Sequence, residues 1–120
     1  MKALYFYVIV SLLSFPVSAQ DQKTSFDGLT VVTVAGGTLA AQLTWTKGYE
    51  DVAYFIVERS TDGIDFKQCA IVFLSEEPDF VEYKFRDKIL TNTHGLLYRI
   101  GIVSNQKRVS YLPTKTLIAP

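Results

Sequence analysis

Two apolar runs flank an Asp-Gly dipeptide near the middle of the chain. Residues 52–60 form the first run, Thr61-Asp62-Gly63 follows it, and residues 66–73 carry the second run. Asp and Gly readily adopt the backbone conformations that tight turns require, so this arrangement is a strong β-hairpin signal. We therefore predict an antiparallel pair of strands joined by a tight turn, with the other strands arranged around it.

Alternation of apolar and polar residues predicts further strands. In residues 39–46 and again in residues 81–86, apolar side chains alternate with mostly polar ones. A period of two places the apolar side chains on one face of a half-buried strand. Three more runs are rich in β-branched and aromatic residues, which favour strands: residues 29–34, 96–104 and 109–118. Pro113 interrupts the last run, so we expect that strand to lie at a sheet edge or bulge there.

Seven such segments, with turn signals about every 8–12 residues, are typical of an antiparallel β-sandwich. No helical period of useful length is present. We therefore predict an all-β fold with seven strands in two packed sheets. The predicted core consists of large apolar side chains on the inward faces: Leu43, Trp45, Phe55, Val57, Phe66, Val72, Tyr83, Phe85, Tyr98, Ile100 and Ile102.

The first nineteen residues have the pattern of a secretory signal peptide. Lys2 precedes an apolar run over residues 3–15, Pro16 ends the run, and Val17-Ser18-Ala19 supplies short side chains before a cleavage point. We predict cleavage after Ala19, a flexible lead-in over residues 20–25 and one sandwich domain over residues 26–120. An uncleaved anchor and a buried strand are the alternatives, although a membrane span needs about 20 apolar residues. We therefore expect no membrane span after cleavage, and a secreted, periplasmic or cell-surface protein.

Charge and composition exclude several classes of function. Lys and Arg number 12, Asp and Glu also number 12, and the basic residues are scattered. A nucleic-acid site needs a clustered basic stripe, so we expect no nucleic-acid partner. The chain has one cysteine, Cys69, and one histidine, His94. An intrachain disulfide and a multi-ligand thiolate or imidazole zinc site are therefore excluded.

Several motifs together resemble a known family. They are Leu43-Thr44-Trp45, then Val57-Glu58-Arg59-Ser60-x-Asp62-Gly63, then Tyr83-x-Phe85-x-Asp87, and finally Leu97-Tyr98-Arg99-Ile100. This set resembles a fibronectin type III-like domain, an immunoglobulin-like sandwich, in the variant found in secreted proteins of the Bacteroidota. The resemblance covers roughly residues 26–119. It implies interaction or spacer roles and no catalytic residues, and because no sorting tail follows Pro120 we expect export by the plain Sec route.

Charged residues within the predicted strands and loops have structural interpretations. Glu58 and Arg99 fall on outward positions of two strands that should be neighbours, which predicts a cross-strand ion pair. Asp62 and Asp65 suit turn chemistry better than a calcium site, which needs six to eight oxygen ligands. Glu76, Glu77 and Asp79, with Asp87 nearby, suggest an acidic rim, but we interpret them as a solvated loop in preference to a binding rim.

No catalytic constellation is apparent. His94 lies in a predicted loop without an obvious partner, and no nucleophile, metalloprotease or phosphate-loop motif is present. Cys69 occupies a position where the resembled family has an aliphatic core residue, so we expect a buried, inert thiol. We predict no catalytic, cofactor-binding or metal-binding residues and no cofactor, and therefore no enzyme.

The function favoured by these patterns is a small exported, non-catalytic interaction module that binds a protein or a glycan. Exposed aromatic side chains are the candidate contacts: Tyr49, Tyr54, Phe80 and Tyr111. The alternative is a structural subunit of an envelope or secreted assembly. It would pair with a partner through an edge strand in residues 109–118, since open strand edges template pairing.

Overall fold

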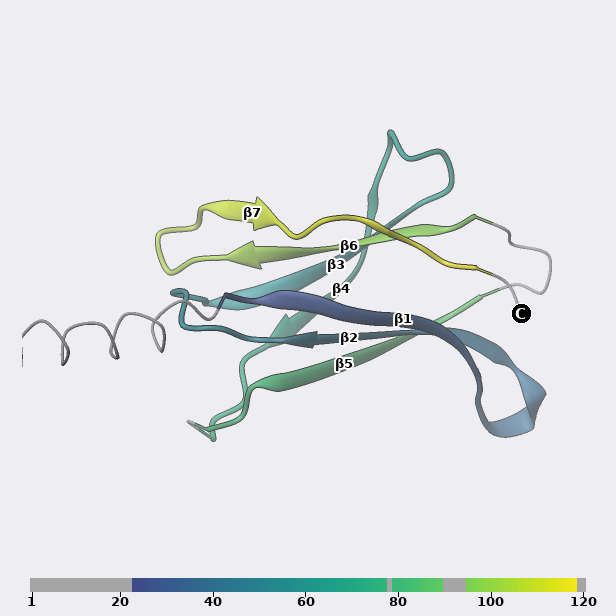
Figure 1. Cartoon of the computed structure of the whole chain (residues 1–120), viewed down its shortest axis with the longest axis horizontal. Coiled ribbons are helices and arrows are strands. Elements are labelled where there is room, and N and C mark those ends of the chain that lie inside the picture. Colours follow the sequence, from purple (N-terminus) through teal and green to yellow (C-terminus); the bar gives the residue numbers. More distant parts are fainter. Residues whose placement is uncertain (1–22, 78, 90–94, 119–120) are drawn as a thin grey trace, which may run out of the picture.

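The computed structural model describes residues 23–77, 79–89 and 95–118. In these residues the chain forms two packed antiparallel sheets and no α-helix, which confirms the predicted all-β sandwich (Figure 1). One sheet has the order β1-β2-β5. The other has the order β4-β3-β6-β7, with β8 also paired to β6. The strands are β1 (Ser25–Thr33), β2 (Leu39–Thr46), β3 (Tyr54–Ser60), β4 (Lys67–Phe73), β5 (Glu82–Lys88), β6 (Leu97–Val103), β7 (Val109–Tyr111) and β8 (Lys115–Thr116).

The inward faces of the strands form the core between the sheets. Trp45 of β2 lies opposite Tyr83 of β5 in the strand register, and their rings stack with centroids 6.0 Å apart. Phe55 of β3 meets the Trp45 ring edge-on from the other sheet. Large buried aromatic side chains dominate the energy of such a core. The apolar residues of the alternating patterns in residues 39–46 and 81–86 therefore point inward and pack one sheet on the other.

Ten of the eleven predicted core residues contribute to this core, and eight of them are buried. Val72 and Phe85 pack against it with partial exposure. The prediction of Phe66 as a core residue is wrong. Phe66 lies at the end of the loop before β4, half-exposed and outside the core cluster, and its ring packs on the guanidinium of Arg99. The core also includes smaller or terminal residues that were not predicted: Phe26, Ala41, Val52, Leu96 and Leu117.

The Asp-Gly segment connects β3 to β4, as predicted, but by a six-residue loop and not by a tight turn. Ser60 Oγ accepts hydrogen bonds from the backbone N–H groups of Asp62 and Gly63. Asp62 Oδ1 in turn accepts from the N–H groups of Ile64 and Asp65. Gly63 has φ +79°, a conformation that glycine adopts without strain. These side-chain hydrogen bonds satisfy backbone N–H groups of the loop, and they allow a longer loop than the Asp-Gly dipeptide alone suggests.

The C-terminal strand is divided at Pro113 into β7 and β8, both of which pair with β6 at the edge of the sheet. This confirms the predicted edge position and explains why eight strands replace the predicted seven. At the other end of the domain, β1 already pairs with β2 at Ser25, within the range predicted as a lead-in. Gly48 also donates a backbone hydrogen bond to the buried Thr24 hydroxyl, so Thr24 and Ser25 both contact the sandwich.

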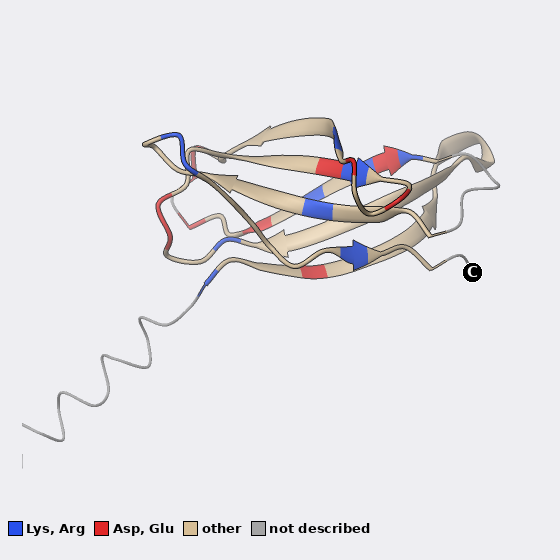
Figure 2. Cartoon of the chain, turned by 90° about the horizontal axis from the view of Figure 1, so that it is seen from above, with Lys and Arg blue, Asp and Glu red and all other residues tan. Residues whose placement is uncertain are grey.

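Some predictions concern residues outside those described. The signal peptide over residues 1–19, the start of the lead-in and the loop position of His94 all lie there. Within residues 23–77, 79–89 and 95–118, no helix is long and apolar enough to cross a membrane. Charges of both signs are interspersed over the strands and loops (Figure 2).

Candidate binding surfaces

The outer face of the β4-β3-β6-β7 sheet carries an unusual number of apolar side chains. The strand register aligns them in two rows across four strands, Phe73–Tyr54–Val103–Val109 and Ile71–Ile56–Gly101–Tyr111. Phe73 is 71% exposed, and Ile71, Val109 and Tyr111 are also exposed. Antiparallel sheets that face water on one side usually present polar residues there. We call the two rows together the apolar face.

Gly101 gives the centre of the apolar face its shape. A Cβ atom at this position would lie 2.5 Å from Cγ1 of Ile56 and 3.0 Å from Cε1 of Tyr111. Ile56 can therefore lie across the bare backbone of β6, and it is only 8% exposed although it points outward. The apolar face is consequently packed and continuous at its centre, with exposed side chains on both sides.

A charged cluster closes one end of the apolar face. Arg99 Nε donates to Glu58 Oε1 at 2.7 Å, which confirms the predicted cross-strand pair. The Arg99 guanidinium lies between two rings, 4.0 Å from the centroid of Phe66 and 3.8 Å from that of Tyr111. Cation–π contacts of this kind contribute about 0.5–2 kcal/mol each, depending on desolvation. The cluster therefore holds the exposed Tyr111 ring in place.

The four aromatic residues predicted as contacts lie in different places. Tyr54 and Tyr111 belong to the apolar face, where Tyr54 is half-buried against Phe73 with centroids 5.9 Å apart. Tyr49 is 70% exposed in the loop between β2 and β3. Phe80 is exposed in the loop between β4 and β5, with its ring edge-on to Tyr83.

Sequence reasoning missed Ile71, Phe73 and Val109 as members of the exposed surface. Residues 70–73 are apolar throughout, so their alternation does not indicate which side chains face outward. The register with β3 decides this, because Ile71 lies opposite Ile56 and Phe73 opposite Tyr54. Val109 lies in the short edge strand β7 opposite Val103, a pairing that the sequence pattern does not reveal.

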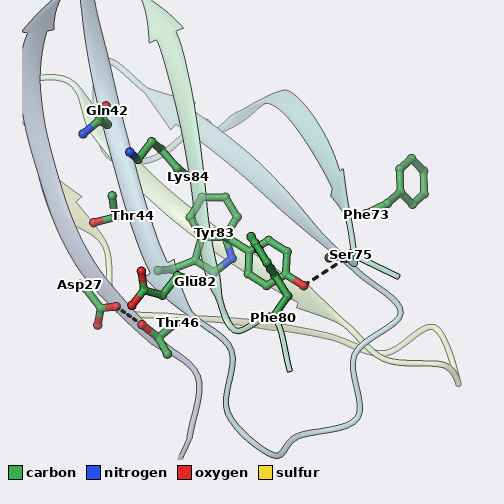
Figure 3. Close-up of a pocket in the computed structure, with 11 residues that line it drawn as sticks. Asp27, Gln42, Thr44, Thr46, Phe73, Ser75, Phe80, Glu82, Tyr83 and Lys84 are labelled. Atoms are coloured by element: carbon green, nitrogen blue, oxygen red, sulfur yellow. Dashed lines mark hydrogen bonds between the residues drawn. The ribbon is translucent and has the colours of Figure 1, made fainter. Parts of the chain in front are cut away.

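A second surface feature lies beside the other sheet. It is an open depression of about 890 Å³ with a polar and an aromatic wall (Figure 3). The polar wall is formed by outward side chains of β1, β2 and β5: Asp27, Gln42, Thr44, Thr46, Glu82 and Lys84. The other lining residues are mainly aromatic, and we call them the aromatic wall: Trp45, Phe73, Ser75, Phe80 and Tyr83. Trp45 and Tyr83 are buried on the inner side of the sheet and support the exposed Phe80, whereas Phe73 points away from the polar wall (Figure 3). We call this feature the polar depression.

Several groups in the polar depression are held in place by their neighbours. Ser25 Oγ and Thr46 Oγ1 both donate to the carboxylate of Asp27, and these hydrogen bonds lower the pKa of Asp27 below its ordinary value. Arg86 Nε donates to Gln42 Oε1 at 2.8 Å, which leaves the amide N–H₂ group of Gln42 as its free donor side. The indole N–H of Trp45 is buried without an acceptor among the described residues.

Asp87 has a different role from the one predicted. It lies within β5, which continues to Lys88, and its side chain is only 15% exposed. Its Oδ2 accepts from Arg59 Nη1 at 2.7 Å and from the Tyr98 hydroxyl at 2.6 Å. Burial, followed by this hydrogen bond, raises the pKa of Tyr98 well above its ordinary value. Asp87 therefore links the two sheets and does not belong to an acidic rim.

Other candidate residues have structural roles or no cluster around them. Cys69 is the extra residue of a bulge in β4, half-buried, and burial raises the pKa of its thiol, which disfavours the reactive thiolate. The Asp62 carboxylate serves the loop, and the hydrogen bonds from Asp65 and Ile64 lower its pKa. Across the residues that the structure describes, no three His, Cys, Asp or Glu side chains gather as a metal site would require.

Comparison with known proteins supports the fold. No family model and no curated protein matches the chain. Two crystal structures of pectate lyase Pel3 from Pectobacterium carotovorum are similar, with TM-scores of 0.56 and 0.57 and identities of 18% and 20%. They cover 79% and 82% of this chain but only 27% of the pectate lyase chain. A β-1,2-glucanase from Parabacteroides distasonis matches with a TM-score of 0.47, 18% identity and coverage of 83% of this chain and 14% of its own.

The protein thus spans about a quarter of the length of the pectate lyase chain that it resembles. At these identities the similarity establishes a shared sandwich fold. The fibronectin type III-like resemblance stays a prediction from the sequence motifs, because no family model matches.

Proposed function

We propose that the protein is an exported, non-catalytic interaction module that binds a protein partner through the apolar face. The observation that carries this proposal is the set of exposed apolar side chains aligned across four strands, with Phe73 71% exposed among them. Contiguous exposed apolar patches on soluble domains mark interaction surfaces. Aromatic side chains such as Tyr54 and Tyr111 supply large contact areas at such interfaces.

The chemistry of the apolar face favours a protein partner over a glycan. Its two rows contain aliphatic and aromatic side chains and few hydrogen-bonding groups, apart from the hydroxyls of Tyr54 and Tyr111. A glycan presents many hydroxyl groups, and burying them without partners is unfavourable. An apolar protein surface loses no such bonds, so it is the better complement to this face.

The absence of catalysis is part of the same proposal. The partly buried carboxylate of Asp87 is occupied by Arg59 and Tyr98. Asp62 and Ser60 are engaged in the loop between β3 and β4. Arg99 and Glu58 are paired with each other. These interactions leave the groups in structural roles, and the similar proteins named as enzymes are matched over only a small part of their chains.

Cross-linking in the native cell, followed by recovery of the protein and mass spectrometry, tests the proposal. The wild type is expected to recover a stoichiometric protein partner in the exported fraction, with Gln20 as the first residue of the mature chain. Ile71→Asp places a charge in the apolar face and is expected to abolish recovery. Thr30→Asp is the matched control, because Thr30 is an exposed strand position on the outer face of the other sheet.

Two outcomes would contradict this assignment. Equal recovery of the partner by Ile71→Asp and Thr30→Asp would move the contact away from the apolar face. A first residue before Gln20 in the recovered protein would contradict the predicted cleavage after Ala19.

For the structural-subunit alternative, β4 offers a better edge for pairing than residues 109–118. β7 has three residues and β8 has two, and Pro113 separates them, so this edge offers little backbone for pairing. β4 is an edge strand of seven residues with no proline and a single charge, Lys67, at its start. Uncharged edges of this length template strand addition. Slowed amide hydrogen exchange in β4 within the complex would favour this alternative, whereas unchanged exchange there would favour docking on the apolar face.

A further inference from the structure

We propose that the polar depression binds a neutral oligosaccharide. This site lies beside the β1-β2-β5 sheet and shares only Phe73 with the apolar face proposed as the protein contact. Its volume of about 890 Å³ falls within the range of small-ligand sites, roughly 300–1,000 Å³. It also has the mixed lining of such sites, in which apolar surface supplies contact area and a few polar groups fix the ligand.

The aromatic wall can accept the apolar face of a sugar ring. Phe80 is 43% exposed, and its ring stands edge-on to Tyr83 with centroids 5.1 Å apart and an interplanar angle of 78°. Tyr83 is itself held, because its hydroxyl accepts the backbone N–H of Ser75 at 3.2 Å and its ring stacks on Trp45. The exposed Phe80 ring is therefore supported from behind by two buried aromatic side chains.

The polar wall offers both acceptors and donors for hydroxyl groups. Asp27 is a charged acceptor whose position is set by Ser25 and Thr46. Gln42, oriented by Arg86, offers its amide N–H₂ group, and Lys84 offers an ammonium group. Each hydroxyl of a sugar can both donate and accept a hydrogen bond, so neighbouring hydroxyls can use both the acceptors and the donors of the polar wall. Hydrogen bonds to charged groups are also stronger than those between neutral groups.

Gly28 keeps the polar wall open near Thr44. Gly28 lies opposite Thr44 in the strand register, and a Cβ there would come within 2.8 Å of Thr44 Oγ1. A side chain at this position would therefore crowd the Thr44 hydroxyl, which lines the polar depression. The glycine leaves that hydroxyl accessible to a ligand.

The charges favour a neutral sugar over an acidic one. Asp27 and Glu82 contribute two carboxylates, and Lys84 is the one cation among the lining residues. Arg86, which donates to the lining residue Gln42, balances the second carboxylate. The depression therefore has no net positive charge to attract a polyanionic chain, whereas a neutral oligosaccharide needs none.

Titration followed by NMR tests this proposal. Labelled protein is titrated separately with cellohexaose, xylohexaose, mannohexaose and oligogalacturonate. At least one neutral hexasaccharide is expected to shift the amide signals of Gly28, Thr44, Phe80 and Lys84 in a saturable way. Oligogalacturonate is expected to cause no saturable shift. Phe80→Ala is expected to weaken binding about tenfold, because it removes the stacking ring.

Paired variants locate the site. Lys84→Ala is expected to weaken binding several-fold, whereas Lys88→Ala is expected to leave it unchanged. Both residues are exposed lysines on the outer face of β5, but Lys88 lies opposite Ala40, outside the lining. The proposal is overturned if no neutral hexasaccharide binds up to millimolar concentration, if oligogalacturonate binds instead, or if the shifts map away from these residues. Phe73 is left unchanged because it belongs to both surfaces, so Ile71→Asp and Phe80→Ala report on the two proposals separately.

Discussion

The two sheets present similar faces to each other and very different faces to the solvent. On their inner sides both supply large buried side chains such as Trp45 and Phe55. On the outside, β2 and β5 present Gln42, Thr44, Lys84 and similar polar residues. The outer face of β4, β3, β6 and β7 is apolar over two rows of the register. Both inner faces must be apolar because they form the core. We therefore expect the binding functions of the two sheets to differ through their outer faces.

The contrast also shows how one sheet of the sandwich can keep an apolar outer face. Ile56 and Val103 point outward yet are buried, because neighbouring side chains and the close approach at Gly101 cover them. The fully exposed apolar area is thereby limited to side chains around this packed centre. On the polar sheet no such covering is needed, because Thr and Gln side chains can bond to water.

The largest effect on stability is expected from the polar contact that links the two sheets at Asp87. Asp87→Ala removes the acceptor of Arg59 and of Tyr98, leaving a partly buried cation and a buried hydroxyl without it. We expect a loss of about 2–3 kcal/mol in the free energy of unfolding, since Arg59 stays partly hydrated. Urea denaturation measures this loss. Asp65→Ala, an exposed loop variant, should change stability by less than about 0.5 kcal/mol. Equal losses for the two variants would show that Asp87 does not link the sheets.

Matched glycine variants sharpen the comparison between the outer faces. Gly101→Ala forces a Cβ against Ile56 in the packed apolar face, and overpacking of this kind costs about 1–3 kcal/mol. Gly28→Ala meets only the Thr44 hydroxyl on the polar sheet, which can rotate away, so we expect less than about 1 kcal/mol. Thermal and urea unfolding of both variants give the comparison. A larger loss for Gly28→Ala than for Gly101→Ala would show that the apolar face is loosely packed.

Cross-strand pairs on the two faces should differ in coupling energy. Glu58 and Arg99 pair on the apolar face, where Phe66 and Tyr111 shield the guanidinium. Gln42 and Arg86 pair on the polar sheet with no charged acceptor. Double-mutant cycles with alanine should give about 1 kcal/mol for the first pair and a few tenths for the second. Equal coupling energies for the two pairs would show that the aromatic rings around Arg99 do not strengthen its pair with Glu58.

The smallest effect concerns acid stability at the polar depression. Asp27 has a lowered pKa because Ser25 and Thr46 donate to it. Such a carboxylate contributes stability above its unfolded pKa of about 3.9, and this contribution is lost as pH falls through the lower folded pKa. Asp27→Asn should therefore lose on the order of a few tenths of a kcal/mol near neutral pH, and the difference should vanish in acid. Thr46→Val removes one donor and should be intermediate. A difference that grows as pH falls would contradict this sign.

Much of the fold follows from local patterns in particular residues. The alternation around Trp45 and Tyr83 predicted two half-buried strands, and Pro113 predicted an edge. The pairing of Glu58 with Arg99 was also predictable, because both lie on outward positions of strands expected to be neighbours. Phe66 was misassigned because the bonds made by Ser60 and Asp62 lengthen the loop before β4. Asp87 continues the inward series of Tyr83 and Phe85, but the predicted strand ended at Arg86 because an acidic residue is seldom expected on an inward face.

The sequence by itself determined the sandwich, its strands and most of its core, because side-chain alternation and turn residues act over short stretches of chain. Only the tertiary structure decided which apolar side chains stay exposed and which polar ones share the polar depression. Ile71, Tyr54 and Tyr111 come from three strands that are distant in the sequence, and hydrogen-bonded register alone aligns them. Surfaces of this kind depend on non-local pairing, and a local pattern carries no record of that pairing.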